Sequence, residues 1–198
     1  MPKTMFAHPL DGFFTAGNYC SDAKKNPDFI IRSLKELSIV VLKPYDAQDI
    51  QFAHCLKSVL GLVVPDAKRA YVAGTRTIIS PEDNHYLVTT EGEARDVLAG
   101  RLNYALGDYA GVFEYSAAYA VLRIDGYHFY DILKSMTACP EHLMRYDNYC
   151  SFIDFDDCQI IVHQKSEDVM FLYLPRAFAP DIYRNIARSC LKFGVRLI

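Results

Sequence analysis

Hydrophobic and polar positions along this chain follow two periods, one typical of strands and one typical of helices. Short β-branched or alternating runs predict strands, with turn-forming residues between them. These runs lie at 38–42, 70–73, 75–80, 85–89, 112–115, 119–124, 150–155, 159–164 and 169–174. Pro81-Glu82-Asp83-Asn84 has the composition of a turn and predicts a hairpin between the fourth strand and its predecessor.

Apolar residues at three- and four-residue spacing predict four helices. The first follows Asp46 as its N-cap and stops at Gly61, and the third runs from about 127 to 136. The second covers 91–106, with its apolar face on Ala94, Val97, Leu98, Leu102 and Ala105. The fourth opens at Pro180-Asp181 and buries Ile182, Ile186, Cys190 and Phe193. Together the elements predict an α+β fold, with antiparallel or mixed sheets and helices packed on their faces.

Residues 1–29 have little periodic pattern and many turn formers, and we expect them to form an extended N-terminal arm. Aromatic residues in the arm, Phe13 and Phe14 among them, favour an arm laid across a partner. Residues 30–198 are expected to form a single domain, with 30–110 and 111–198 as two candidate lobes.

Composition indicates a globular protein, since 51% of the 198 residues are hydrophobic and 23% are charged. A net charge of −3 gives no basic footprint for nucleic acid. No apolar run approaches the roughly 20 residues of a membrane-spanning helix. The first residues also lack the pattern of a secretory signal. We therefore expect no nucleic-acid or membrane partner, a cytoplasmic location and reduced cysteines.

Candidate chemistry along the chain is sparse. The sequence contains neither Gly-x-Gly-x-x-Gly nor Gly-x-x-x-x-Gly-Lys, so it lacks the usual binding motifs for dinucleotides and nucleoside triphosphates. We expect no FAD or NAD on this chain, and we assign no catalytic, cofactor-binding or metal-binding residues.

Three alternatives to that assignment are weaker. Cys150, Cys158 and His163 are separated by seven and four residues, which is unlike the short spacing of a zinc clamp. Cys139, close to His142, lacks an evident activating cation or helix terminus for a nucleophile. Asp156-Asp157 is more typical of a solvated hairpin turn than of paired acid–base carboxylates.

Two arginines are candidates for contacts. Arg123 and Asp125 lie on one face of a predicted strand, so Arg123 is either an anion-binding or intersubunit residue, or half of a surface ion pair. Arg176 follows Pro175 and precedes a helix, where a guanidinium can brace backbone carbonyls or reach a partner's carboxylate. Of these two roles, we favour a hydrogen-bonding role of Arg176 toward backbone carbonyls of its own chain.

The order of these elements resembles the gamma subunit of heterotetrameric sarcosine oxidase. Three segments carry the resemblance: 76–88, with its Ser-Pro-Glu turn; Ser-Ala-Ala-Tyr-Ala-Val-Leu-Arg-Ile-Asp-Gly at 116–126, followed by a helix and Cys139-Pro140; and Phe-Leu-Tyr-Leu-Pro-Arg-Ala-Phe-Ala at 171–179. The resemblance covers roughly the last two-thirds of the chain. It implies a fold related to the folate-binding domain of the T-protein and TrmE type.

The resemblance also implies an accessory subunit of a flavin-dependent oxidase that demethylates sarcosine to glycine. Alpha, beta and delta subunits would be its partners, and FAD, FMN, NAD and tetrahydrofolate are expected on those partners. Arg176 and Phe178 lie in the third segment, and Tyr119 and Arg123 lie in the second. With Phe13 and Phe14, they are the candidate subunit contacts.

Two other functions stay open. The same kind of subunit could serve a dehydrogenase of N-methylglutamate or another N-methyl amino acid, because substrate choice would lie on another chain. A stand-alone folate-binding or one-carbon transfer domain is the third reading, and it would need a pocket with a carboxylate for the pterin.

Overall fold

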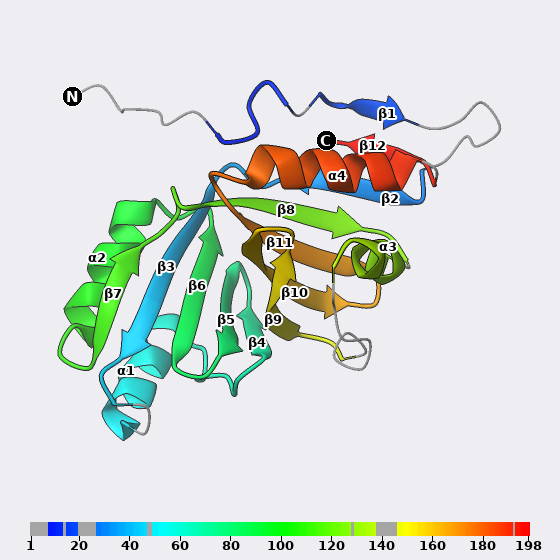
Figure 1. Cartoon of the computed structure of the whole chain (residues 1–198). Helices are drawn as coiled ribbons and strands as arrows, with labels where there is room; N and C mark the ends of the chain where they lie inside the picture. The colour runs from blue at the N-terminus through cyan, green and yellow to red at the C-terminus, as the bar shows by residue number, and fades with distance from the viewer. Residues whose placement is uncertain are drawn as a thin grey trace, which may run out of the picture. The chain divides into compact units, whose positions relative to one another are not determined.

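The computed structural model describes residues 8–13, 15–19, 27–46, 49–127, 129–137, 146–191 and 193–198. The chain divides into two compact units that are discontinuous in sequence (Figure 1). Unit 1 consists of 1–35, 117–147 and 153–198, and unit 2 consists of 36–116 and 148–152. The candidate lobes of the sequence analysis, 30–110 and 111–198, have different boundaries.

Unit 1 contains a mixed sheet in the order β1-β12-β2-β8-β11-β10. β12 runs parallel to β2, and the pairs β1–β12, β2–β8, β8–β11 and β11–β10 are antiparallel. The strands are Gly17–Tyr19 (β1), Phe29–Ser33 (β2), Tyr119–Asp125 (β8), Cys158–Ser166 (β10), Val169–Pro175 (β11) and Val195–Leu197 (β12). The strand Tyr149–Phe155 (β9) has residues in both units.

Two helices, Phe129–Met136 (α3) and Ala179–Leu191 (α4), cover one face of the unit 1 sheet. Phe29 of β2 shows how: its ring meets Phe129 of α3 and Phe193 edge-on, with centroids 5.9 and 5.8 Å away. Figure 1 shows α4 lying along β2 and β12. The buried stripe of α4 consists of Ala179, Ile182, Tyr183, Ile186 and Cys190.

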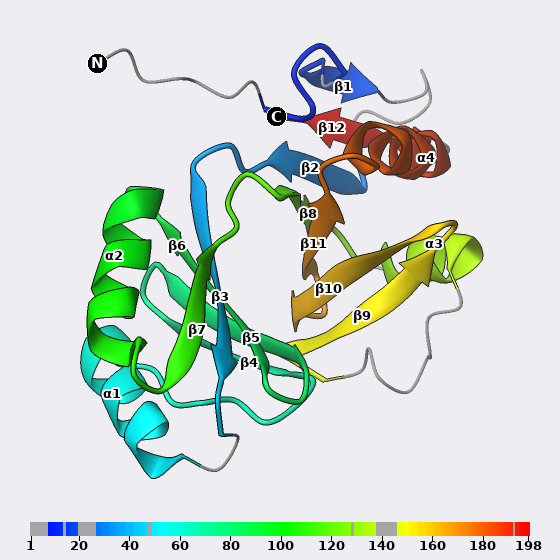
Figure 2. The ribbon, with the colours of Figure 1, turned by 60° about the vertical axis from the view of Figure 1, so that its left-hand side comes forward.

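Unit 2 contains the antiparallel sheet β4-β5-β6-β3-β7, and the start of β9 pairs with β4. Figure 2 shows both of its helices, α1 and α2, on one face of this sheet. The strands are Leu37–Pro44 (β3), Arg69–Ala73 (β4), Arg76–Glu82 (β5), His85–Glu91 (β6) and Ala110–Glu114 (β7), and the helices are Ile50–Leu60 (α1) and Arg95–Leu106 (α2).

The core of unit 2 forms where alternate strand residues meet the helices. Burial of this apolar surface is the main stabilising contribution, at roughly 25 cal/mol per Å². The core consists of Val40, Leu42, Phe52, Leu56, Leu60, Leu62, Ile78, Tyr86, Val88, Leu98, Leu102, Leu106 and Ala110.

The predicted α+β class is confirmed, and most predicted elements form within a few residues of their expected bounds. Two helix starts differ. Asp49, rather than Asp46, caps α1, because its Oδ1 accepts a hydrogen bond from the Gln51 N–H at 2.7 Å. α2 begins at Arg95 after the extended Ala94, and it buries Leu98, Leu102 and Leu106, while Val97 is exposed.

The described part of the N-terminal arm lies against unit 1 of its own chain. Leu10 is fully buried, and β1 adds an edge strand to β12. The Asp11 carboxylate accepts a hydrogen bond from Lys35 Nζ at 2.8 Å. Contacts within the chain therefore order residues that the sequence analysis assigned to a partner-bound arm.

Gly126 ends β8 in a conformation that requires glycine. Its φ is +154°, and an added Cβ would lie 2.5 Å from both the Asp28 carbonyl oxygen and the Phe29 Cδ1 atom. The described helices include none long and apolar enough to cross a membrane.

Candidate functional site

A row of side chains crosses four strands of the unit 1 sheet, on the face opposite α3 and α4. Register pairs Arg32 of β2 with Arg123 of β8, Arg123 with Phe171 of β11, and Phe171 with His163 of β10. Residues that face one another across strands point to the same side of a sheet. This row and its neighbours form the first candidate site.

Arg123 and Asp125 form a two-pronged ion pair along β8. The Arg123 Nε lies 2.9 and 3.2 Å from the two carboxylate oxygens, and an Nη atom lies 2.6 Å from Oδ1. The Arg32 Nε lies 3.9 Å from the other oxygen, Oδ2. Of the two alternatives for Arg123, the surface ion pair with Asp125 is therefore formed within this chain. Both partners are part-exposed, so the pair contributes about 1 kcal/mol at most.

Phe171 connects the arginine to a buried histidine. The Arg123 Cζ lies 5.9 Å from the Phe171 ring centroid, which is within the range of a cation–π contact. The His163 ring stacks on Phe171, with centroids 5.7 Å apart and planes at 20°.

His163 is only 2% exposed, and its Nε2 has no hydrogen-bond partner among the described residues. Burial, with a smaller contribution from the charge of Lys165, lowers the pKa of His163 to about 4. The imidazole is therefore neutral at pH 7. A neutral, enclosed imidazole that stacks on a phenyl ring acts as a packing residue here.

The Leu-Pro-Arg-Ala-Phe segment forms the turn between β11 and α4. The Arg176 N–H donates to the Ala118 carbonyl at 2.8 Å, and the Phe178 carbonyl accepts from the N–H groups of Asp181 and Ile182 at 3.1 Å. Tyr119 lies beside this turn, and its ring meets Tyr173 edge-on at 6.4 Å. The structure thus brings Tyr119 and Arg176 to one end of unit 1.

The aromatic contact candidates differ in how much surface they offer. Phe178 is 44% exposed and Phe13 is 50% exposed. The Phe13 ring also lies 5.8 Å from the Arg184 guanidinium carbon of α4. Phe14 lies outside the described residues.

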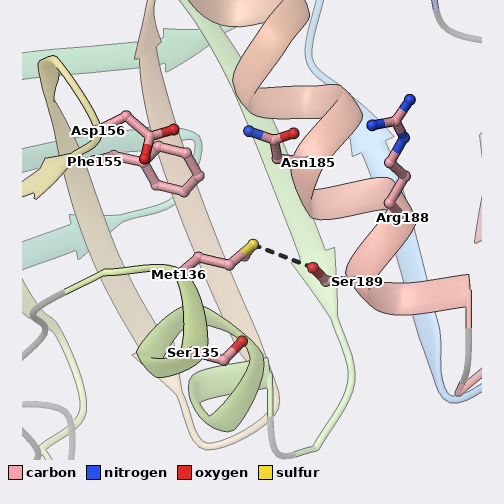
Figure 3. Close-up of a pocket in the computed structure, with 7 residues that line it drawn as sticks. All are labelled: Ser135, Met136, Phe155, Asp156, Asn185, Arg188 and Ser189. Atoms are coloured by element: carbon pink, nitrogen blue, oxygen red, sulfur yellow. Dashed lines mark hydrogen bonds between the residues drawn. The ribbon is translucent and has the colours of Figure 1, made fainter.

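A pocket of about 420 Å³ opens between α3, α4 and the turn that joins β9 to β10 (Figure 3). Phe155 and Met136 give it apolar walls, and the Ser189 hydroxyl donates to the Met136 sulfur at 3.3 Å. The Arg188 side chain points away from Asn185 and Asp156 in this view. The lining residues are Ser135, Met136, Phe155, Asp156, Asn185, Arg188 and Ser189.

The pocket does not fit the pterin of a folate. Its one carboxylate, Asp156, is exposed at the hairpin tip, with φ of 48°. Such a position gives water access to the carboxylate, whereas a pterin needs an acidic group inside an enclosed apolar site. Hydroxyl and amide groups on the other walls can hydrogen-bond a small polar molecule, but they supply no general base.

The cysteines and the candidate metal ligands are placed apart. Cys150 is buried and its thiol donates to the Arg69 carbonyl at 3.2 Å, while Cys158 begins β10. Burial raises the pKa values of Cys150 and Cys190 to about 12, so both thiols stay protonated at neutral pH. The described residues include no cluster of three or more metal-ligating side chains. Cys139 and His142 lie outside them.

The sequence patterns alone did not predict most of the strand row or the pocket described above. Arg32 lies in a short strand that the periodic patterns did not predict, and the pocket joins residues far apart in sequence. His163 was considered only as a metal ligand. The alternation along 119–124 did identify Arg123 and Asp125 as neighbours on one face, and the structure confirms that placement.

Fold comparisons place this chain in a defined structural class. It has the α+β fold, with a mixed sheet and packed helices, that is found in sarcosine oxidase and in the glycine-cleavage T-protein. No protein-family model matches the sequence, and no curated protein matches it either.

Two of the solved structures with a similar fold show how far the likeness extends. One is a chain of the heterotetrameric sarcosine oxidase of Corynebacterium sp. U-96, determined in complex with pyrrole 2-carboxylate. It has a TM-score of 0.74 and 13% identity, and the match covers 93% of this chain and 94% of that one. The other is glycine cleavage system aminomethyltransferase T from Bartonella henselae, with a TM-score of 0.64 and 10% identity. That match covers 86% of this chain but only 48% of the aminomethyltransferase.

Proposed function

We propose that this chain is an accessory, gamma-type subunit of a heterotetrameric sarcosine oxidase. The complex would demethylate sarcosine to glycine with a flavin as oxidant, and this chain would contribute structure and no catalytic residue. The observation that carries the proposal is the extent of the likeness to the sarcosine oxidase chain, which covers 93% of this chain and 94% of the other.

The partners in this proposal are the alpha, beta and delta chains, and FAD, FMN, NAD and tetrahydrofolate would be bound by them. Tyr119, Arg123, Arg176, Phe178, Phe13 and Phe14 are the proposed subunit contacts. Exposed aromatic surface at Phe13 and Phe178 supports this assignment, since aromatic residues and arginine are enriched at interfaces. A stable assembly would cover on the order of 1,600 Å² or more.

A related assembly is the nearest alternative: the equivalent subunit of an N-methylglutamate dehydrogenase. The same fold and contacts would serve both complexes, because the substrate would bind to another chain. Which N-methyl amino acid the purified complex oxidises distinguishes the two.

A stand-alone folate-binding or one-carbon transfer domain is the second alternative. The likeness to the aminomethyltransferase favours it, whereas the exposed position of Asp156 in the pocket argues against it. Titration of the isolated chain with tetrahydrofolate tests it directly, and saturable binding would support it.

Co-expression tests the proposed subunit role. The chain, carrying an affinity tag, is produced together with large flavoprotein chains from the same organism. We expect a complex of fixed stoichiometry that elutes as one species and oxidises sarcosine. Recovery of the tagged chain alone, from cells that contain abundant soluble flavoprotein chains, would contradict the proposal.

A further inference from the structure

One face of the unit 1 sheet carries an excess of arginine. β12 pairs Arg196 with Ile30 of β2, and β2 pairs Ile30 with Asp125 of β8. This second row adjoins the row of Arg32, Arg123 and Phe171. We call Arg32, Arg123, Asp125 and Arg196, together with Ile30, Val169 and Phe171, the arginine face.

The opposite side of the same strands is the one that the helices cover. Phe29 alternates with Ile30 along β2, and the Phe29 ring contacts Phe129 of α3 and Phe193 near the end of α4. Ile30 and Arg32 therefore point away from α3 and α4. This geometry separates an apolar, helix-covered side from a side where charged groups alternate with apolar ones.

The arginine face remains accessible in the described structure. The side chains of Arg32, Arg123 and Asp125 are 41%, 33% and 21% exposed. Arg196 is exposed, and Ile30, Val169 and Phe171 are half-buried. The surface is thus open to a partner without any rearrangement of the sheet.

Charge on this face is unbalanced. The face carries three guanidinium groups and one carboxylate, Asp125, which Arg123 contacts through its Nε and an Nη atom and which the Arg32 Nε approaches at 3.9 Å. Within the part of the chain that the structure describes, the buried Arg32 Nε has no hydrogen-bond partner and the Arg196 side chain makes no ion pair. Further carboxylates lie at the ends of these strands: Asp28 just before β2, and Glu167 and Asp168 just before β11, where Asp168 accepts a hydrogen bond from the Ser166 hydroxyl at 2.6 Å. The exposed Arg196 side chain and the exposed part of the Arg32 side chain therefore retain donors for an acceptor from outside.

We infer that the arginine face docks a carboxylate-rich surface of a partner protein, which in the proposed complex is a flavoprotein chain. This inference rests on the proposed function. Arginine presents paired N–H donors that match a carboxylate, and such pairs set the orientation of an interface. Apolar Ile30, Val169 and Phe171 between the arginines match the mixed composition of protein interfaces. None of these residues lines the pocket of Figure 3, so the arginine face is an open surface and no part of an enclosed small-molecule site.

The test reverses two charges and measures affinity. The full chain with Arg32→Glu and Arg196→Glu is compared with the unchanged chain for binding to the purified flavoprotein chains. We expect the dissociation constant to rise at least about tenfold, because like charges then face one another. Arg32→Lys with Arg196→Lys keeps the charge and should bind more tightly than the glutamate variant. Raising the salt concentration should weaken the unchanged chain more than the glutamate variant.

A matched control makes the same change in net charge elsewhere. Lys57 of α1 and Arg95 of α2 are exposed on unit 2, and Lys57→Glu with Arg95→Glu should leave the affinity unchanged. Cooperative urea unfolding of each variant verifies that it is folded.

The outcomes separate the inference from the proposed function. If the unchanged chain binds and the Arg32 and Arg196 glutamate variant binds equally well, the docking face is wrong and the subunit role stands. If the unchanged chain does not bind, both are overturned. If the same glutamate variant instead turns a dimer of this chain into a monomer in sedimentation, the occupant is a second copy, and the inference is wrong.

Discussion

At the scale of residues, His163 shows how an environment changes a side chain's chemistry. Its imidazole stacks on Phe171 and is enclosed on β10, where burial disfavours the charged form. The pKa of about 4 means that the folded protein resists taking up a proton there.

This resistance predicts a pH dependence of stability. The unfolded chain binds a proton at His163 with a pKa near 6.5, while the folded state does so only near 4. Between these values the unfolded state holds more protons, so the free energy of unfolding falls as the pH falls. The loss at His163 should reach about 3 kcal/mol by pH 4 and be absent above pH 7.

Urea unfolding of the unchanged chain and of His163→Phe at several pH values measures this loss. Carboxylates titrate in the same range in both proteins, so the difference between the two curves isolates the histidine. We expect that difference to shift by about 3 kcal/mol in favour of the variant between pH 7 and pH 4. Parallel curves would show that His163 is protonated equally in both states.

The sequence could not indicate this residue's role. A histidine between Val162 and Gln164 in a strand reads equally well as a surface residue, a metal ligand or a core residue. Its partner Phe171 becomes a neighbour only through the pairing of β10 with β11. By contrast, Arg123 and Asp125 are two residues apart in one strand, and alternation alone places them on one face.

At the scale of elements, two glycines illustrate opposite backbone roles. Gly100 lies exposed within α2, and an added Cβ there would meet nothing within 4 Å. Gly126 has a φ of +154° and no space beside Phe29 and the Asp28 carbonyl. Gly100 therefore destabilises its helix through the loss of backbone entropy, whereas the turn after β8 requires glycine at position 126.

Substituting alanine at each site should therefore have opposite effects. Gly100→Ala should stabilise the protein by about 0.5–1 kcal/mol, because alanine loses less backbone entropy in a helix. Gly126→Ala should destabilise it by about 2–4 kcal/mol through steric overlap and strain at positive φ. Chemical denaturation measures both, and two changes of the same sign would contradict this account.

Periodicity predicted long elements well and their edges poorly. The run Ser38–Leu42 forms as expected within β3, and α4 buries the predicted Ile182, Ile186 and Cys190. Phe193 was expected in the same stripe, but it lies beyond the end of the helix at Leu191 and is half-buried. The apolar face of α2 was assigned with Ala94 and Val97, but the helix starts at Arg95 and turns Leu98, Leu102 and Leu106 inward. β1 and β12 contain three residues each, too few to show a period, and they form because the sheet supplies their partners.

At the scale of the whole molecule, the two units are built from interleaved segments. Unit 1 takes its strands from both ends and from the middle of the chain, so no single cut in the sequence separates the units. A boundary near residue 110 followed naturally from the order of predicted elements. Only long-range pairing, such as β2 with β8 and β12, reveals the actual division.

The central claim is that this chain docks and that turnover takes place on other chains. The most direct measurement is the absorption spectrum and amine-oxidising activity of the chain purified by itself. The account predicts a colourless protein that does not oxidise sarcosine or another N-methyl amino acid. A tightly bound flavin together with oxidation of such an amine by the isolated chain would contradict it.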